Sequence, residues 1–119
     1  MTLGTAVHTV LIKKYASFEG RASRSEYWYF FLACFLAGFG VGFVGGLAGL
    51  SLDVINQISL VVQLVVLIPS IAAGVRRIHD SNRSGWFLLV PLYNLYLLII
   101  KGTNGPNRFG TDPLAEPVV

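Results

Sequence analysis

The chain has 119 residues and a formal net charge of +3; 54% of its residues are hydrophobic and only 13% are charged. A soluble domain of this size usually carries about 25% charged residues, so the composition excludes an ordinary soluble domain and indicates a single membrane domain over residues 1–119. The basic residues lie in short clusters beside apolar runs, which is typical of positive-inside topology and excludes nucleic acid as the expected partner. The only cysteine is Cys34, so no intrachain disulfide is expected.

Residues 3–18 predict an amphipathic helix. Its apolar residues share one side of a helical wheel, and they are Leu3, Val7, Val10, Leu11 and Phe18. Lys14 interrupts this stripe, so two interpretations stay open: a helix lying in the membrane interface, and a helix packed on the rest of the bundle. The N-terminal residues lack the pattern of a cleavable signal, and we expect the first span to act as its own uncleaved signal.

The first membrane span is predicted over residues 26–51. Ser23 is placed to cap this helix, and Glu26 three residues later fits a capping box. Tyr27, Trp28 and Tyr29 are typical of an aromatic belt at the membrane interface. As a helix, the uncharged residues 27–52 measure about 39 Å, which exceeds the roughly 30 Å hydrocarbon core and predicts a tilted or frayed span.

Four glycines are predicted to share one narrow face of the first span. They are Gly38, Gly42, Gly45 and Gly49. Small residues spaced in this way let another helix approach closely. The face is therefore predicted to pack either against the second span, which we favour, or against a second copy of the chain.

The second span is predicted over residues 54–76, after a short loop without lysine or arginine. Asp53 is expected to cap it, and Pro69 is expected to kink it. Its polar and small residues share one face, and they are Asn56, Ser59, Gln63, Ser70 and Gly74. Only Gln63 lies near the middle of the bilayer and no ionisable group accompanies it, so hydrogen bonding between helices is favoured over a transport path.

The stretch of residues 76–86 organises the chain, because it places charged residues between two apolar runs. A charge at mid-bilayer costs about 2.5–3.5 kcal/mol, so this stretch is predicted to be a loop at one membrane face. Its arginines assign that face to the cytoplasm, and two spans then place the N-terminus in the cytoplasm as well.

A third apolar segment is predicted over residues 84–101, with an apolar run of only about 15 residues, fewer than a spanning helix usually has. Pro91 and Asn94 interrupt it. It either crosses the membrane fully or enters and returns, and the positive-inside rule prefers the return. Residues 102–119 are rich in turn formers and are predicted to be a polar tail near the basic loop.

Three motifs in order resemble a known family. They are Phe18-Glu19-Gly20-Arg21-Ala22-Ser23-Arg24-Ser25-Glu26-Tyr27-Trp28, then Arg76-Arg77-Ile78-His79-Asp80 with Arg83-Ser84-Gly85-Trp86, then Gly102-Thr103-Asn104-Gly105 with Asn107-Arg108-Phe109-Gly110 and Asp112-Pro113. From about Tyr15 to Pro113 the chain is similar to the domain of unknown function 805 family, which are small bacterial inner-membrane proteins with no established activity. The apolar run after Trp86 is shorter here than is usual in that family, which argues against a standard third crossing.

The charged residues of these motifs predict an interfacial polar cluster. Its candidate members are Glu19, Arg21, Arg24, Glu26, Arg76, Arg77, His79, Asp80, Arg83, Asn107, Arg108 and Asp112. We expect the arginines to orient the protein and to pair with Glu19, Glu26 or Asp80 at the level of the headgroups. Clustered basic residues also attract anionic lipid headgroups, by about 1 kcal/mol each.

The sequence therefore predicts an all-α membrane protein, a small helical bundle with two full transmembrane helices. The favoured function is a structural or interaction component of the bacterial inner membrane that contacts the bilayer, lipid headgroups, a second copy of itself or a partner membrane protein. The alternative is a small transporter or channel subunit. The least favoured is an enzyme at the interface that uses His79 and Asp80 for acid–base chemistry. No catalytic residue, cofactor or metal is expected, because no nucleophile or metal-ligand set is recognisable.

Overall fold

The computed structural model describes residues 2–114, and within them it is all-helical apart from one isolated bridge between Asn107 and Gly110. The elements follow in the order α1 (Leu3–His8), the π-helix η1 (Thr9–Lys13), α2 (Arg24–Leu47), α3 (Leu52–Asp80), the 3-10 helix η2 (Gly85–Leu89) and α4 (Tyr93–Ile99). Among the described residues, α2 and α3 are the two helices long and apolar enough to cross a membrane. The predicted all-α membrane class is confirmed.

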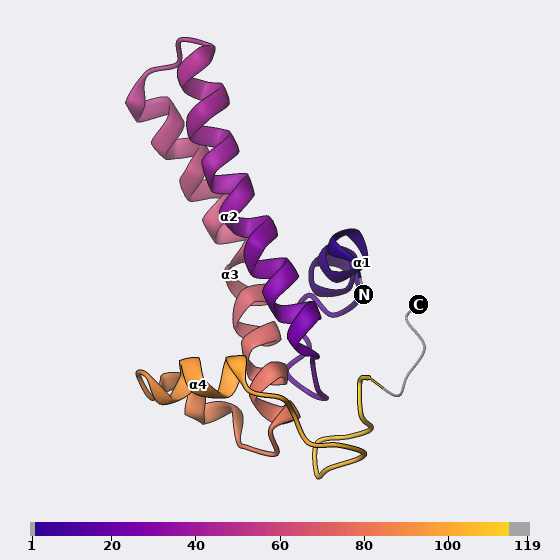
Figure 1. Cartoon of the computed structure of the whole chain (residues 1–119). Helices are drawn as coiled ribbons and strands as arrows, with labels where there is room; N and C mark the ends of the chain where they lie inside the picture. Colours follow the sequence, from indigo (N-terminus) through magenta and orange to yellow (C-terminus); the bar gives the residue numbers. More distant parts are fainter. Residues whose placement is uncertain (1, 115–119) are drawn as a thin grey trace.

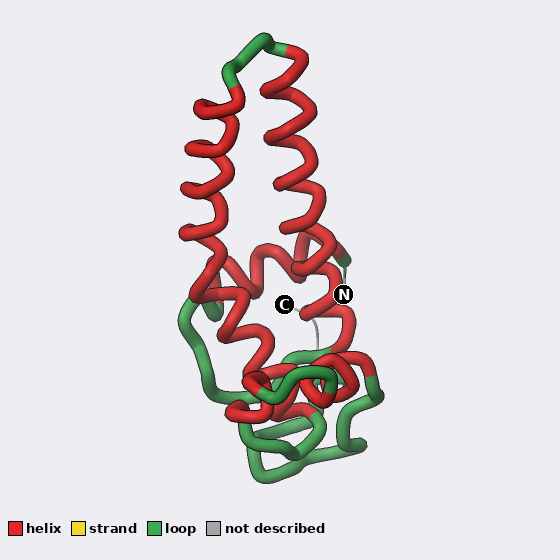
Figure 2. Tube along the Cα trace, turned by 90° about the vertical axis from the view of Figure 1, so that its left-hand side faces the viewer, coloured by secondary structure: helices red, strands yellow, loops and turns green. Residues whose placement is uncertain are grey.

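Helices α2 and α3 form a long antiparallel hairpin, with α1 beside its lower half and α4 across its base (Figures 1 and 2). The predicted N-cap of α2 is present, because the backbone N–H of Glu26 donates to the Ser23 hydroxyl at 3.2 Å. The Glu26 carboxylate is not used for a capping box. It pairs with Arg76 of α3 instead, so it joins the two helices at their base.

The turn at the far end of the hairpin differs from the prediction in two ways. Helix α2 ends at Leu47, and Gly49 follows with a φ of +76°, while the N–H of Leu50 donates to the carbonyl of Gly45 at 3.0 Å. This is a glycine-terminated helix end, so Gly49 forms the turn and not a packing face. Ser51, whose backbone is extended, caps α3 through the N–H of Val54, whereas Asp53 already lies inside the first turn.

The glycine face contacts the second span only at Gly45. A Cβ built at Gly45 would lie 2.9 Å from Cγ1 of Ile55, whereas one built at Gly38 or Gly42 would meet nothing within 4 Å. The predicted packing of Gly42 on the second span is therefore wrong. At that level the helices are separated by a cavity of about 460 Å³, which Gly38, Ser59 and Gln63 border.

Helix α3 does not end where the lipid-facing span was predicted to end. Pro69 lies inside this helix, which continues through residue 76 to Asp80. A helix can extend beyond its apolar residues into a charged segment when the arginines of that segment are paired within the protein. The carboxylates and carbonyls described below are these partners.

The N-terminal helical segment is shorter than predicted and ends at Lys13, not at residue 18. It packs against the hairpin through Ala6, Thr9 and Val10, which are buried. Val10 forms a small core with Phe30 of α2 and Ala73 of α3. The structure thus contains the packed form of this helix.

The third apolar segment folds back on itself. A Cβ at Gly85, where the segment begins, would touch Val75 and His79 of α3, and the carbonyl of Ile100, where it ends, accepts from Arg77. Both ends therefore lie at the base of α3. Between them η2 and α4 face each other, with Phe87 and Tyr93 in an edge-to-face contact, and Leu97 and Leu98 pack on Ile78.

Candidate functional site

The base of the hairpin contains a buried charge cluster, formed by Arg21, Glu26, Arg76, Arg77 and Asp80. Oδ1 of Asp80 accepts from Nε of Arg21 at 2.9 Å, and Oδ2 accepts from Nη1 of Arg77 at 2.6 Å. All five side chains are almost fully buried, and Arg76 and Arg77 have no exposed surface. Three cations face two carboxylates, so one positive charge is left for backbone carbonyls to stabilise.

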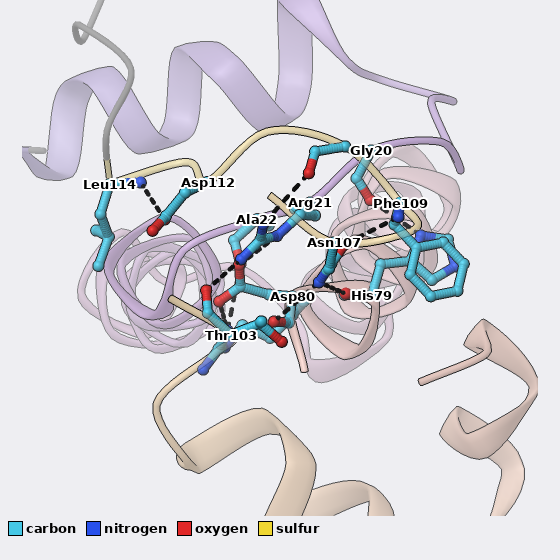
Figure 3. A network of polar contacts seen from close by, with 12 residues as sticks. Gly20, Arg21, Ala22, His79, Asp80, Thr103, Asn107, Phe109, Asp112 and Leu114 are labelled. Carbon is cyan, nitrogen blue, oxygen red and sulfur yellow. Dashed lines mark hydrogen bonds and ion pairs between the residues drawn. The ribbon is translucent and has the colours of Figure 1, made fainter. Parts of the chain in front are cut away.

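Arg21 uses its remaining donors to hold the tail. Its Nη1 donates to the carbonyl of Gly105 at 2.6 Å and to that of Gly110 at 3.3 Å, and its Nη2 donates to the carbonyl of Thr103 at 2.6 Å. Figure 3 shows Arg21 between Asp80 and the tail. One planar guanidinium therefore joins the segment before α2, the end of α3 and the tail, which a lysine could not do with the same geometry.

Arg77 and Arg76 hold the other segments that meet at this end. Arg77 donates to the carbonyls of Leu98 and Ile100 at the end of α4, and to that of Ala22 at 3.3 Å. Arg76 pairs with Glu26 and donates to the carbonyl of Ser17 at 3.1 Å. The predicted approach of Glu26 to Arg76 is present. Nη2 of Arg76 has no hydrogen-bond partner among the described residues.

His79 lies beside the charge cluster but does not pair with a carboxylate. Its Nδ1 is 2.9 Å from the carbonyl oxygen of Gly20, and its ring stacks on that of Phe109 with the centroids 4.0 Å apart. Asn107 supports this arrangement, because its amide donates to the backbone carbonyl of His79 at 3.1 Å while its own oxygen accepts from the N–H of Phe109 at 2.8 Å.

Asp112 and Arg108 fix the tail at its surface. The backbone N–H groups of Leu114 and Gly105 donate to the Asp112 carboxylate, and these bonds hold its pKa below the usual range. Arg108 donates to the carbonyl of Asn82 at 3.3 Å and lies over the Phe109 ring. Both residues therefore lie at the same end of the hairpin as the buried charge cluster, which we call the polar end, but neither is part of that cluster.

Other predicted members stay outside the charge cluster. Glu19, Arg24 and Arg83 are exposed, and within residues 2–114 none of them forms an ion pair. The predicted pairing of Glu19 is therefore absent from this part of the chain. Gln63 is exposed on α3, far along the helix from these groups, and borders the cavity between the two long helices.

Several residues that build the site were not recognised from the sequence. Nε1 of Trp28 donates to the carbonyl of Leu98 at 2.9 Å, and the N–H of Thr103 donates to that of Asp80 at 2.7 Å. A Cβ on Gly102 would lie 1.8 Å from Oδ2 of Asp80, so only glycine fits there. The glycines of the tail were the available signal, because a missing side chain allows a close approach of the backbone to a buried ion pair.

The fold and this charge cluster define a class: a small helical membrane protein in which buried ion pairs lie at one end of the two apolar helices and are covered there by the chain's own tail. The model of the family described as "Protein of unknown function (DUF805)" matches residues 15–111, and the chain belongs to this family.

Two relatives support the assignment. The chain is 37% identical over 110 residues to the inner membrane protein YhaI of Escherichia coli strain K12, covering 87% of this chain and 91% of the relative. It is 35% identical over 115 residues to the inner membrane protein YhaH of the same strain, covering 90% and 95%. No solved structure matches this chain. The family is one of unknown function, and these relatives are named only as inner membrane proteins.

Proposed function

We propose that the protein is a non-catalytic component of the bacterial inner membrane that binds anionic phospholipid headgroups at its polar end. The observation that carries this proposal is a cavity of about 290 Å³ at the start of α2, bordered by Arg24, Lys101 and the hydroxyl-bearing residues Ser23 and Ser25. Two cations and two hydroxyl groups around one cavity suit a phosphate group.

The charges around this cavity favour an anion. Arg24 and Lys101 are exposed, and neither forms an ion pair within residues 2–114. Asp80 also borders the cavity, but its carboxylate is already engaged by Arg21 and Arg77. The potential in the cavity is therefore set by the two unpaired cations, and each basic residue near a membrane surface contributes about 1 kcal/mol to binding anionic lipid.

The distribution of charge supports a cytoplasmic polar end and a cytoplasmic N-terminus. All nine lysines and arginines lie in residues 13–24, 76–83 and 101–108, and the loop between α2 and α3 contains none. The bonds from Arg21 to Thr103 and Gly105 keep the third group at the same end as the first two. By the positive-inside rule this end faces the cytoplasm.

The geometry of His79 and Asp80 supports a non-catalytic role. A general acid–base pair needs a proton-accepting group within reach of the other partner or of a substrate. Here the Asp80 carboxylate is buried between two arginines, and Nδ1 of His79 faces a backbone carbonyl. Neither group is therefore placed to assist the other in proton transfer.

Calorimetric titration of the purified full chain in neutral detergent tests the lipid site. Short-chain phosphatidylglycerol should bind more tightly than short-chain phosphatidylcholine, and the double variant Arg24→Gln/Lys101→Gln should weaken the phosphatidylglycerol affinity by about tenfold or more. Arg83→Gln is the matched control, because Arg83 is also exposed but lies outside the cavity. Equal losses in the double variant and the control would refute a defined site.

A fusion of alkaline phosphatase after Val119 tests the orientation. The enzyme folds only in the periplasm, so a cytoplasmic C-terminus should leave the fusion inactive while a fluorescent-protein fusion at the same position is bright. Strong phosphatase activity would mean that the polar end faces the periplasm or that the tail has crossed.

A transporter or channel subunit is the second candidate, because the cavity between α2 and α3 reaches Gln63 and Ser59. The other residues that border it are apolar except Cys34, which suits a lipid chain better than a polar solute. Cys34 provides the test. A membrane-impermeant thiol reagent should not modify it in intact vesicles, whereas Cys34→Ala/Ser51→Cys should be modified from the loop side. Rapid labelling of Cys34 would favour the transport candidate.

A further inference from the structure

A third cavity differs in character from the proposed anion site, because it is lined almost entirely by apolar side chains. It measures about 390 Å³ and lies between the last turns of α3 and η2, with Ile71, Val75, Trp86 and Leu89 among its walls. Ile71, Val75 and His79 are spaced four residues apart on one face of α3, so His79 stands at the polar end of this cavity.

The hydrogen bond of the His79 ring determines which of its two nitrogens can accept a hydrogen bond from a ligand. Nδ1 is 2.9 Å from the carbonyl of Gly20, and a carbonyl only accepts, so Nδ1 carries the proton. Asp80, the nearest carboxylate in sequence, is engaged by Arg21 and Arg77 and gives the buried ring no counter-charge for a second proton. Nε2 is then an acceptor with a lone pair, on a residue of which only 8% is exposed.

His79 borders the cavity, and its Nε2 has no hydrogen-bond partner among the described residues. A Cβ built at Gly85, which borders the cavity, would lie 3.4 Å from Nε2 and 2.6 Å from Cγ1 of Val75, so the glycine leaves the approach open. Ser84 borders the same end. Its oxygen accepts from the N–H of Trp86 at 3.4 Å, which leaves the hydroxyl proton to be donated elsewhere.

We propose that this cavity binds a neutral, single-chain membrane amphiphile whose terminal hydroxyl donates to Nε2 of His79 and accepts from the Ser84 hydroxyl, with its alkyl chain along Ile71, Val75 and Leu89. The volume lies at the lower end of the range of about 300–1,000 Å³ for ligand sites, which suits one chain and not two. No charged side chain lines the cavity, so a hydroxyl matches it better than a phosphate or a carboxylate.

The position of the cavity explains how such a ligand would reach it. Trp86 is 80% exposed and Leu89 is 72% exposed, so the rim presents apolar and aromatic surface beside the lipid-facing part of α3. A ligand dissolved in the bilayer can enter from this rim with its hydroxyl toward the polar end. This binding is independent of the proposed headgroup site, because the two cavities share no residue.

Nitrogen NMR of the full chain in phosphatidylcholine nanodiscs, with 1-hexadecanol as the probe, tests the proposal. Before addition, His79 should show the proton on Nδ1 and a bare Nε2. Saturating hexadecanol should shift the Nε2 resonance in the direction of hydrogen bonding, and hexadecane should not. The other histidine, His8, is exposed and outside the cavity and serves as an internal control. A proton on Nε2 before addition, or an Nε2 unchanged at saturation, would overturn the proposal.

Two variants separate binding in the cavity from a general effect of the alcohol on the bilayer. Ile71→Trp should fill the cavity and abolish the shift, whereas Leu67→Trp, one turn earlier and outside the cavity, should retain it.

If Ile71→Trp does not fold, Ser84→Ala removes one hydrogen bond and should weaken hexadecanol binding by about threefold to tenfold. Unchanged binding in Ser84→Ala would contradict the assigned geometry. Arg24→Gln/Lys101→Gln should leave the hexadecanol response intact, so this proposal and the headgroup proposal can fail separately.

Discussion

The two halves of the α2–α3 hairpin are built on opposite principles. Between residues 31 and 68 only Gly45 is buried, and most of the exposed side chains are large and apolar. From Pro69 to the end of α3, nine residues are buried, and four of them are Arg76, Arg77, His79 and Asp80. The half that lipid would surround therefore has little packing of its own, whereas the polar half contains nearly all of the buried residues of the hairpin.

This difference follows from the solvent of each half. Inside a bilayer, lipid chains are as apolar as leucine, so burying leucine against another helix gains little and the distal helices can lie apart. At the membrane surface, charged groups must be either hydrated or paired, and buried pairs require exact partners. The position of the tail and of α4 is therefore specified by a few arginines, while the distal hairpin is specified mainly by its length.

The largest expected effect is the loss of the carboxylate shared by two arginines. Asp80→Asn keeps the shape but leaves Arg21 and Arg77 buried without a counter-charge, and removing one partner of a buried ion pair costs about 3–5 kcal/mol. Equilibrium unfolding in detergent should show a loss of this size. Asp53→Asn, exposed at the distal end, is the control and should change stability by less than about 0.5 kcal/mol. Equal stability of both variants would contradict the contrast between the halves.

A smaller loss is expected at the close contact between the tail and Asp80. In Gly102→Ala the new Cβ would meet Oδ2 of Asp80 and the backbone carbonyl of the same residue at 2.8 Å, so the tail must move. Overpacking typically costs about 1–3 kcal/mol, and the upper end is expected because backbone cannot yield as a side chain can. Gly4→Ala, where a Cβ meets nothing within 4 Å, is the control. Proteolysis of the tail should accelerate in the first variant only.

The same contrast separates what the sequence could predict from what it could not. Hydrophobic length predicted two long helices, and local chemistry correctly placed the Ser23 cap, because both depend on neighbouring residues alone. The cap of α3 was assigned to Asp53, whereas Ser51 provides it. Both residue types are good N-caps and they lie two positions apart, so the sequence alone did not distinguish them. The Glu26–Arg76 pair was predictable, because antiparallel helices bring opposite charges to one end.

The role of the tail could not be predicted, because it depends on backbone acceptors. Arg21 binds the carbonyls of Thr103, Gly105 and Gly110, and every residue type has a carbonyl, so no pattern of side chains marks these positions. The glycine face of the first span shows the opposite problem. Its spacing is a genuine pattern, but only Gly45 has a neighbour to pack against, because the helices diverge toward the cavity at Gly38.

That divergence gives a prediction of moderate size in the distal half. Gly45→Leu should lower the free energy of unfolding in detergent by about 1–2 kcal/mol, because its side chain must displace Ile55. Gly42→Leu should leave stability unchanged or raise it by about 0.5–1 kcal/mol, since a helical glycine is replaced without a clash. Equal destabilisation of both variants would mean that the helices are packed along the whole face.

The smallest expected effect concerns the pH dependence of the tail. The N–H groups of Leu114 and Gly105 donate to the carboxylate of Asp112 and lower its pKa in the folded protein relative to the unfolded chain. Between the lowered pKa and the ordinary carboxyl pKa, the folded state therefore binds fewer protons than the unfolded chain. The stabilisation is fully present above the ordinary carboxyl pKa, and it is lost as the pH falls through the lowered pKa of Asp112. Water screens this surface group, which keeps the effect local to the tail. Hydrogen exchange at the Gly105 amide should accelerate when the pH falls below the ordinary carboxyl pKa. In Asp112→Asn this amide should be less protected than in the unsubstituted chain, and its protection should not depend on pH. The exchange rates are corrected for their intrinsic dependence on pH. If the corrected rate in the unsubstituted chain does not change over the same pH range, the tail is held by Arg21 alone.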